Sequence, residues 1–409
     1  MVPEGWRAVP VSDICTLKNG HGFKPQEWDT KGLPIIRIQN LNGNENFNYF
    51  SGEPEKEWVV EPGQMLFAWA GTKGVSFGPT IWRGQTGVLN QHIFKVLPDT
   101  AVDEDWLFYC LRSVTERIER KAHGFKATLV HVRKSEIDNQ IILCPPIGDQ
   151  KRIAEILSTW DRAIGVTENL MKNSRAQKTA LLQQLLTGKT RFPEHVRSRS
   201  FKNTAYGRIP SDWDFVHISD VAREVSSRNA DDHDYPVVSC SKHRGFVNSL
   251  EYFKKQVFSE NRTTYKIISR GQFGFPSNHI EEGSIGHQDL HDHALVSPIY
   301  CVFEASERIN HRYLYSLLKT DRYRQLFSAA TNGSVDRRGN LRWKEFSKIG
   351  VFLPSLEEQE SITSAIGILD RNLRTKEALL AKLRQEKSAL MQQLLTGKRR
   401  VKIDKEIAA

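Results

Sequence analysis

The sequence predicts an α+β protein in which two mixed α/β domains are separated by two long antiparallel coiled-coil helices, with an internal pseudo-two-fold repeat. The string QQLLTGK occurs twice, at 183–189 and at 392–398, which are 209 residues apart (392 − 183). Apolar residues with heptad spacing precede both copies, as in coiled-coil helices. The two remaining segments have the size of single domains and contain short β-type runs bounded by Gly, Asn and Pro.

The domain boundaries follow from the position of these helices. A proline stands before the start of each helix, and the stretch after the first helix is basic and punctuated by Pro and Gly, which is typical of a linker. The predicted ranges are 1–145 for the first mixed domain, 146–190 for the first helix, 191–205 for a basic linker, 206–354 for the second mixed domain, 355–400 for the second helix and 401–409 for a tail.

Each long helix carries a seam of residues at alternating spacings of four and three. A helix with such a seam needs a partner, and the simplest partner is its own repeat, although each helix could instead pack on its neighbouring domain. Polar residues within the seam, such as Lys178 and Lys387, would help to set the register. The seam positions are Ile153, Leu157, Trp160, Ile164, Thr167, Met171, Ser174, Lys178, Leu181 and Leu185, and then Ile362, Ile366, Leu369, Leu373, Lys376, Leu380, Leu383, Lys387, Leu390 and Leu394.

The two long helices are closely similar in sequence, whereas the two domains are only faintly similar. Gln150 recurs as Gln359 at the start of the helix, whereas EGWRAVPVSDI at 4–14 only resembles SDWDFVHISDV at 211–221. The two domains share short similar stretches in the same order, whereas the loops between these stretches differ. Such a pair suggests two readers of two different targets held at a fixed separation.

The bulk composition favours a polyanionic partner. The chain of 409 residues has a formal net charge of +10, 39% hydrophobic residues and five cysteines without a CxxC pair. Scattered cysteines favour a reducing, cytoplasmic location, and no apolar run approaches the roughly 20 residues that span a bilayer. The positive charge then points to double-stranded DNA, whose major-groove faces recur every ~34 Å, although a merely basic surface remains an alternative.

The repeated TGK string is predicted to end a helix and not to bind a nucleotide. A Walker A loop would need a glycine at 183, where the chain has Gln183, and its lysine would have to open a helix. Gly188 and Gly397 instead follow an apolar helical run, where a left-handed residue is expected, with Lys189 and Lys398 near the negative end of the helix dipole.

No catalytic motif stands out. The adenine-methylase clamp N-P-P-[YF] and the G-x-G-x-x-G loop are both missing from the sequence, although dispersed carboxylates could still build a nuclease. His287, His291 and His293 have the chemistry of metal ligands, and the first two would share one face of a helix. The following ALVSPIY run reads as a strand, so we expect solvated or DNA-facing histidines and no metal site.

Base recognition needs forked donors, amides and hydroxyls on exposed loops, and two loops in each domain have them. Any one of these side chains could instead be an ordinary solvated loop residue. The candidate DNA-binding residues are Trp69, Thr72, Lys73, His123, Lys126, Thr128, His131 and Arg133 in the first domain, and Ser277, Asn278, His279, Asn332, Ser334, Arg337 and Arg338 in the second.

Two variable domains alternating with two helices that end in QQLLTGK resemble the specificity (S) subunit of type I restriction-modification systems. The resemblance covers essentially the whole chain. It implies a non-catalytic subunit whose two target-recognition domains each read one half of a bipartite DNA sequence, while the paired helices act as a ruler.

The same resemblance implies the partners. The helices would dock methyltransferase (M) subunits, expected as two copies, and restriction or motor (R) subunits would join the complex. S-adenosylmethionine, ATP and Mg would be bound by those partners and not by this chain. The recognition loops match the family only in frame, so no target sequence is carried over.

The sequence leaves two rival functions open. The first is a self-contained DNA methylase or nuclease with two reading domains, which would methylate or cut DNA without other subunits. The second is a coiled-coil scaffold without DNA preference, which would bind all duplexes equally.

Overall fold

The computed structural model describes residues 2–121, 129–332 and 340–401. The chain divides into two compact units. Unit 1 comprises Met1–Asn169 with Glu377–Ala409, and unit 2 comprises Leu170–Lys376. Each long helix therefore contributes one segment to each unit.

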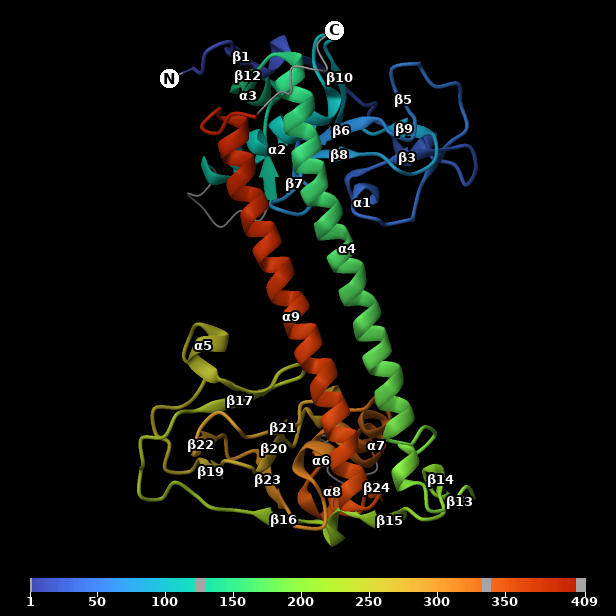
Figure 1. Cartoon of the computed structure of the whole chain (residues 1–409), viewed down its shortest axis with the longest axis vertical. Coiled ribbons are helices and arrows are strands. Elements are labelled where there is room, and N and C mark those ends of the chain that lie inside the picture. Colours follow the sequence, from blue (N-terminus) through green and yellow to red (C-terminus); the bar gives the residue numbers. More distant parts are fainter. Residues whose placement is uncertain (1, 122–128, 333–339, 402–409) are drawn as a thin grey trace. The chain divides into compact units, whose positions relative to one another are not determined.

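The two long helices are α4 (Ile147–Leu185) and α9 (Leu356–Leu395), and both lie within the ranges predicted for them (Figure 1). All twenty predicted seam positions are buried or half-buried. Both helices end as expected, because Gly188 and Gly397 have φ of +67° and +66°, the left-handed conformation that terminates a helix.

Within each unit the two helical segments run antiparallel. In unit 1, Asp161 pairs with Lys387 and Glu168 pairs with Arg384, so rising numbers on α4 meet falling numbers on α9. In unit 2, Lys178 of the seam pairs with Asp370. The two lysine–aspartate pairs are repeat equivalents, 209 residues apart, so Lys178 and Lys387 of the seam each gain a partner on the other helix.

Unit 1 combines small sheets with one main helix, α2 (Glu104–Lys121), which packs beside β8 (Figure 1). Trp106 of α2 is fully buried in the core that α2 shares with the four-stranded sheet β2-β10-β6-β8. The strands are β1 (Arg7–Pro10) with β12 (Ile141–Cys144); β2 (Cys15–Asn19), β10 (Ile93–Pro98), β6 (Met65–Ala68) and β8 (Gly78–Ile81); β4 (Tyr49–Phe50), β3 (Leu33–Ile36), β9 (Gly87–Leu89) and β5 (Val59–Val60); and β7 (Ala70–Thr72) with β11 (Leu129–His131). The short helices are α1 (Ile38–Leu41) and α3 (Lys134–Asp138).

Unit 2 repeats the central part of this topology. Its four-stranded sheet has the order β16-β23-β20-β21, which corresponds strand for strand to β2-β10-β6-β8. The strands are β13 (Phe201–Thr204) with β14 (Gly207–Pro210); β15 (Asp214–His217) with β24 (Gly350–Leu353); β16 (Ala222–Val225), β23 (Tyr300–Ala305), β20 (Phe273–Pro276) and β21 (Gly286–His287); β17 (Val238–Ser241) with β18 (Gly245–Asn248); and β19 (Lys266–Ser269) with β22 (His293–Val296). The helices are α5 (Ser249–Phe253), α6 (His311–Leu318), α7 (Asp321–Asn332) and α8 (Trp343–Phe346).

The repeated glutamines connect the long helices to these domains. Gln150 accepts a hydrogen bond from the backbone N–H of Asp103, the residue that caps the start of α2, at 2.9 Å. Gln359 accepts one from the N–H of Asn310, the cap of α6, at 2.7 Å. The recurrence of glutamine thus follows from one geometry that is repeated in both units, in which a buried amide side chain connects a domain helix to the start of a long helix.

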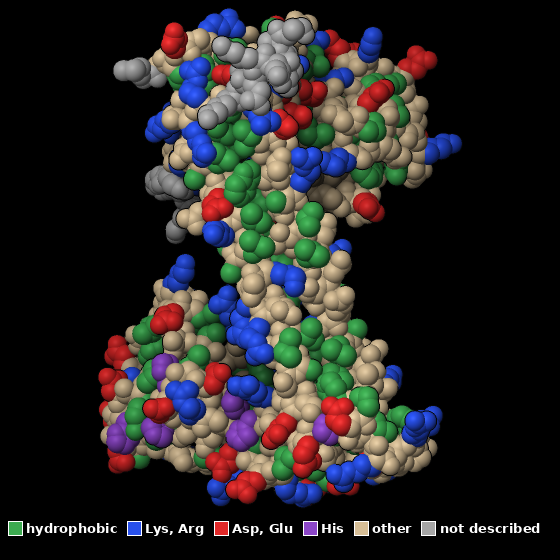
Figure 2. Space-filling model, in the orientation of Figure 1, with side chains coloured by type: hydrophobic (Ala, Val, Ile, Leu, Met, Phe, Trp, Pro, Cys, Tyr) green, Lys and Arg blue, Asp and Glu red, His purple; other side chains and the backbone are tan. Residues whose placement is uncertain are grey.

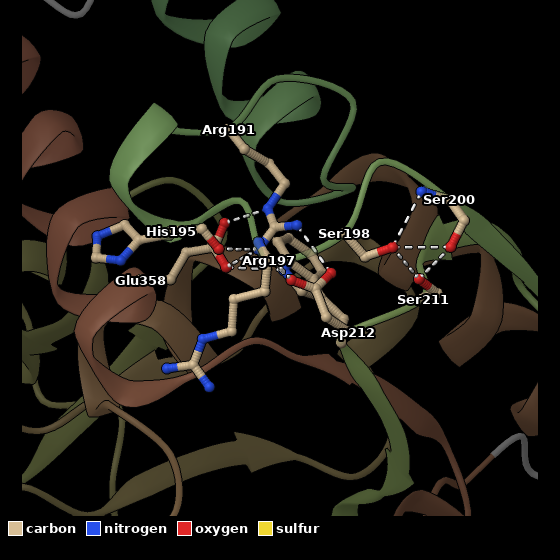
Figure 3. Close-up of polar contacts among 9 residues, drawn as sticks. Arg191, His195, Arg197, Ser198, Ser200, Ser211, Asp212 and Glu358 are labelled. Atoms are coloured by element: carbon tan, nitrogen blue, oxygen red, sulfur yellow. Dashed lines mark hydrogen bonds and ion pairs between the residues drawn. The ribbon is translucent and has the colours of Figure 1, made fainter.

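The segment predicted as a basic linker is built into unit 2. It contains the short helix η3 (Pro193–His195) and strand β13, and Arg191 lies buried at its start. Figure 3 shows the Arg191 side chain reaching between Glu358 and Asp212. The prediction of a linker was wrong here because a basic residue near Pro and Gly can also form a buried ion pair. The partners of Arg191 are Asp212, 21 positions away, and Glu358, 167 positions away, so the local sequence does not show them.

None of the described helices is long and apolar enough to cross a membrane.

Candidate nucleic-acid interface

In unit 1 the structure brings the two predicted recognition loops together. Strand β7 follows the central strand β6 and pairs antiparallel with β11, which lies beyond α2. The carbonyl of Trp69 accepts the Val132 N–H at 3.1 Å, and the Trp69 indole N–H donates to the Gln91 carbonyl at 3.1 Å. The Trp69 ring meets the His131 ring edge to face at 4.8 Å. An aromatic and a titratable side chain are therefore placed side by side at the end of the sheet.

The turn after β7 is held in one conformation by the end of α2. The backbone N–H of Gly74 donates to the buried Glu119 carboxylate at 2.8 Å, and the Lys73 ammonium donates to the Glu119 carbonyl at 3.2 Å. The Thr72 N–H bonds Ser76 Oγ at 2.8 Å. Lys73 thus secures the turn by binding the carboxyl end of a helix. The side chain of Val75 is left exposed at the tip.

The histidines of this region differ in environment. His131 is exposed, whereas His92, which lies beside Trp69, is partly buried. Burial lowers the pKa of His92, and the neighbouring His131 lowers it further, so the ring stays neutral near pH 7. Arg133 is exposed two residues beyond β11, and its backbone N–H donates to Glu136 at the start of α3. A guanidinium is suited to binding phosphate or guanine.

In unit 2 the equivalent turn follows β20. The carbonyl of Ser277 accepts the Leu341 N–H at 2.8 Å, which joins this turn to the segment beyond α7. The same two chain segments therefore meet in both units. The prediction of an exposed loop is wrong for Ser277, which is buried because it directly follows the fully buried strand β20 and is bonded to the segment beyond α7. Asn278 is half-buried and His279 is exposed.

The remaining predicted residues lie outside what the structure describes. The ranges 122–128 and 333–339 are not described, and neither is the side chain of Asn332, the last residue of α7. The residues concerned are His123, Lys126, Thr128, Ser334, Arg337 and Arg338.

The three histidines considered as metal ligands do not converge. His287 is in strand β21, so the shared helix face is not formed. His291 Nε2 lies 2.6 Å from Asn248 Oδ1, and His293 Nδ1 lies 3.1 Å from Ser269 Oγ. Figure 2 shows histidine side chains on the drawn face of unit 2 as separate groups.

Another group, in the turn after β20, has metal-ligand chemistry. His279, Glu281 and Glu282 each place one donor atom within 4.8 Å of the others. His279 and Glu282 are exposed, and Glu281 is half-buried. Exposed carboxylates are common without a metal, so this group is part of the surface beside the predicted base-reading turn.

Sequence reasoning missed a buried polar cluster in unit 2, which we call the Arg191 clasp: Arg191, Asp212, Trp213 and Glu358. The Arg191 guanidinium donates to Glu358 at 2.7 and 2.8 Å and to Asp212 at 2.8 and 3.0 Å. The Trp213 indole donates to Glu358 at 2.9 Å. The hydrogen bonds that Arg191 donates to Glu358, and then those to Asp212, raise the pKa of Arg191, so the guanidinium keeps its charge despite burial.

Unit 1 carries the repeat equivalent of this clasp in a weaker form. Arg400 and Asp149 stand 209 residues from Arg191 and Glu358, and their charged atoms are 3.9 Å apart. Arg400 lies over the Trp6 ring at 5.7 Å, as Arg191 lies over Trp213. The 209-residue spacing was therefore a signal that could have identified both clasps from the sequence.

A family model described as the type I restriction modification DNA specificity domain matches residues 3–173 and 210–385. The MjaVIII specificity subunit of a type I restriction enzyme from Methanocaldococcus jannaschii is 26% identical to this chain, over 98% of this chain and 94% of that protein. The type I restriction enzyme EcoBI specificity subunit from Escherichia coli is 24% identical over 52% of this chain and 45% of that protein.

Solved structures share the fold. The S subunit of a type I restriction-modification system from M. genitalium superposes with a TM-score of 0.53 at 17% identity, covering 96% of both chains. A chain from a study of complex assembly and conformational transition of the type I R-M system superposes with a TM-score of 0.59 at 13% identity, covering 98% of this chain and 100% of that chain.

Proposed function

The chain belongs to the family of type I restriction-modification DNA specificity domains, and from this premise we propose that it is the DNA-reading, non-catalytic specificity subunit of a type I restriction-modification complex. Each unit would read one half of a bipartite sequence in double-stranded DNA. The chain would act in the cytoplasm, where that DNA lies.

One observation carries this proposal. The two units have the same four-stranded sheet order, and in both the turn after the central strand meets the segment after a helix, yet the residues of these turns differ. The turn of unit 1 has the half-buried Thr72 and the exposed Val75 on either side of Lys73, which holds the turn, whereas the turn of unit 2 has the half-buried Asn278 and the exposed His279. A shared scaffold with unlike contact residues is what two readers of unlike base sequences require.

The helices supply a second element of the proposal, a docking surface for methyltransferase subunits. Hydrophobic side chains outside the seam are exposed along α4 and α9 (Figure 2). They include Val166 and Leu379 in unit 1, and Leu170 and Ile368 in unit 2. Exposed apolar side chains on a helix are typical of a protein interface. The methyltransferase and motor subunits would bring S-adenosylmethionine, ATP and Mg, so that the chemistry takes place on the partners.

The proposal is tested by reconstitution. The purified chain is mixed with its cognate methyltransferase subunit, S-adenosylmethionine and unmethylated genomic DNA, and methylated adenines are mapped by sequencing. We expect methylation at a single split sequence only when both proteins are present. Methyl transfer or cutting by the chain alone would favour the self-contained enzyme, and equal binding to all duplexes without directed methylation would favour a scaffold.

A further inference from the structure

The turn between β7 and β8 of unit 1 exposes a single side chain at its tip. Of residues 71–78, only Gly74 and Val75 are exposed, and glycine has no side chain. Val75 is 68% exposed, the largest value among the exposed large hydrophobic residues that the structure describes. Valine is also unusual in a turn, where Gly, Pro, Asn, Asp and Ser are preferred. The tip of this turn is therefore one apolar, β-branched side chain.

The polar groups of the turn hold it in shape. The carbonyl of Thr72 accepts the Val75 N–H at 3.1 Å. The Gly74 N–H donates to the buried carboxylate of Glu119 at 2.8 Å, and the Lys73 ammonium donates to the carbonyl of the same residue at 3.2 Å. The only cationic side chain of the turn is thus directed back to the protein, and the tip is ordered before any ligand binds.

The position before the valine leaves the space beside it open. Gly74 has a φ of +67°, and an added Cβ would meet no atom within 4 Å. A left-handed backbone favours glycine, so no side chain projects from this position. Valine itself has few rotamers, and little side-chain entropy is lost when it is ordered against a ligand. The turn therefore suits a close contact between one rigid apolar group and a small apolar target.

Duplex DNA offers such a target in its major groove. The edges of adenine, guanine and cytosine present hydrogen-bond donors and acceptors there, whereas thymine also presents its C5 methyl group. A valine side chain gains nothing from a donor or an acceptor. It does remove apolar area from water when it packs on a methyl group, which is favourable.

We propose that Val75 is a specificity-determining residue of unit 1, which contacts the C5 methyl group of a thymine in the major groove and so selects an A·T pair at that position. This inference rests on the proposed function and names one base that unit 1 reads. The turn of unit 2 differs in kind, because its exposed residues His279 and Glu282 are polar. We therefore expect no such dependence on a methyl group from the turn of unit 2.

The test removes the methyl group from the DNA. Methylated sites mapped after reconstitution with the cognate methyltransferase subunit give the split sequence. Duplexes then carry 2′-deoxyuridine in place of each thymine in turn, which deletes the methyl group and keeps the base pairing. Affinity for the reconstituted complex is measured by fluorescence anisotropy at one fixed salt concentration, because phosphate contacts make affinity depend on salt. We expect uracil to weaken binding about three- to fivefold at a position in one half of the sequence, which is the effect of one methyl group.

The second arm removes the valine. Val75→Ala should leave the fold intact because the side chain is exposed. We expect this variant to bind the thymine and uracil duplexes equally at the position identified with the parent chain. The matched control is Val257→Ala in unit 2, where the valine is 46% exposed, and it should keep the preference of the parent chain.

Three results would overturn the inference. The first is a parent chain whose affinity is unchanged by every uracil substitution. The second is a thymine preference that survives Val75→Ala at every position. The third is weaker binding of Val75→Ala to the methyltransferase subunit with thymine preference intact, which would assign the valine to a protein contact. A complex that directs methylation to no split sequence would instead refute the proposed function itself.

Discussion

Replacing Arg191 with methionine should destabilise unit 2 far more than the equivalent change in unit 1. The Arg191 side chain is 7% exposed and that of Glu358 is 2% exposed, so the substitution leaves a buried carboxylate without its cation. Removing one partner of a buried ion pair costs about 3–5 kcal/mol. Since 1 kcal/mol corresponds to roughly 2–4 °C in a domain of this size, the melting temperature of unit 2 should fall by at least about 6 °C.

The repeat provides the matched control, Arg400→Met. Arg400 is 49% exposed and its charged nitrogen lies 3.9 Å from Asp149, so this pair should contribute only about 0–1 kcal/mol. Differential scanning calorimetry gives the melting temperatures, and hydrogen exchange of peptides from each unit assigns the change to unit 2 or unit 1. Equal losses for the two substitutions would refute the argument that burial, and not the presence of the arginine, determines the cost.

Three further predictions concern single residues. In unit 1 the buried indole N–H of Trp6 has no partner among the described residues, whereas the Trp213 indole of unit 2 donates to Glu358. Asp149 is the repeat equivalent of Glu358 and has a shorter side chain, so Asp149→Glu should supply the missing acceptor and raise the free energy of unfolding by about 0.5–1.5 kcal/mol in urea titrations. Burial lowers the pKa of His287, and a histidine kept neutral in the fold loses stability as the pH drops below its unfolded pKa of about 6.5, so His287→Leu should flatten the fall in melting temperature between about pH 6.5 and pH 5. Gly188→Ala should destabilise by at least about 1 kcal/mol in the same titrations, because φ is +67° and the added Cβ would lie 2.5 Å from Pro210, whereas Gly165→Ala in mid-helix should stabilise by about 0.5–1 kcal/mol.

Each of these predictions has its own counter-result. A neutral or destabilising Asp149→Glu would mean that Trp6 is satisfied in another way. If the exposed His243→Leu flattened the pH profile as much as His287→Leu does, the burial of His287 would not be the cause. A Gly188→Ala chain as stable as the parent would show that the left-handed end of α4 is not required.

The long helices could be predicted from the sequence because their signals are local and periodic. Each helix carries its own signals: a heptad seam, lysines within the seam and a glycine after the last turn. The structure places Lys178 and Lys387 against aspartates of the partner segment. The 209-residue repeat also indicated these two aspartates, because Asp161 recurs as Asp370.

The recognition domains were predicted only in outline, because their geometry depends on contacts distant in sequence. The pairing of β7 with β11 joins residues almost sixty positions apart, and no periodic pattern marks it. The buried Arg191 looked like a solvated linker charge because its acceptor Glu358 lies 167 positions away. Long-range ion pairs and strand pairing are set by the tertiary fold, and short windows of sequence carry little of that information.

The most direct test of two independent readers exchanges one turn at a time. Residues 72–77 of unit 1 and residues 277–282 of unit 2 are each replaced by a turn from another specificity subunit, and methylated sites are sequenced after reconstitution with the cognate methyltransferase subunit. If the two units read DNA independently, each exchange alters one half of the split sequence and leaves the other half and the gap unchanged. Loss of both halves together after either exchange would contradict it.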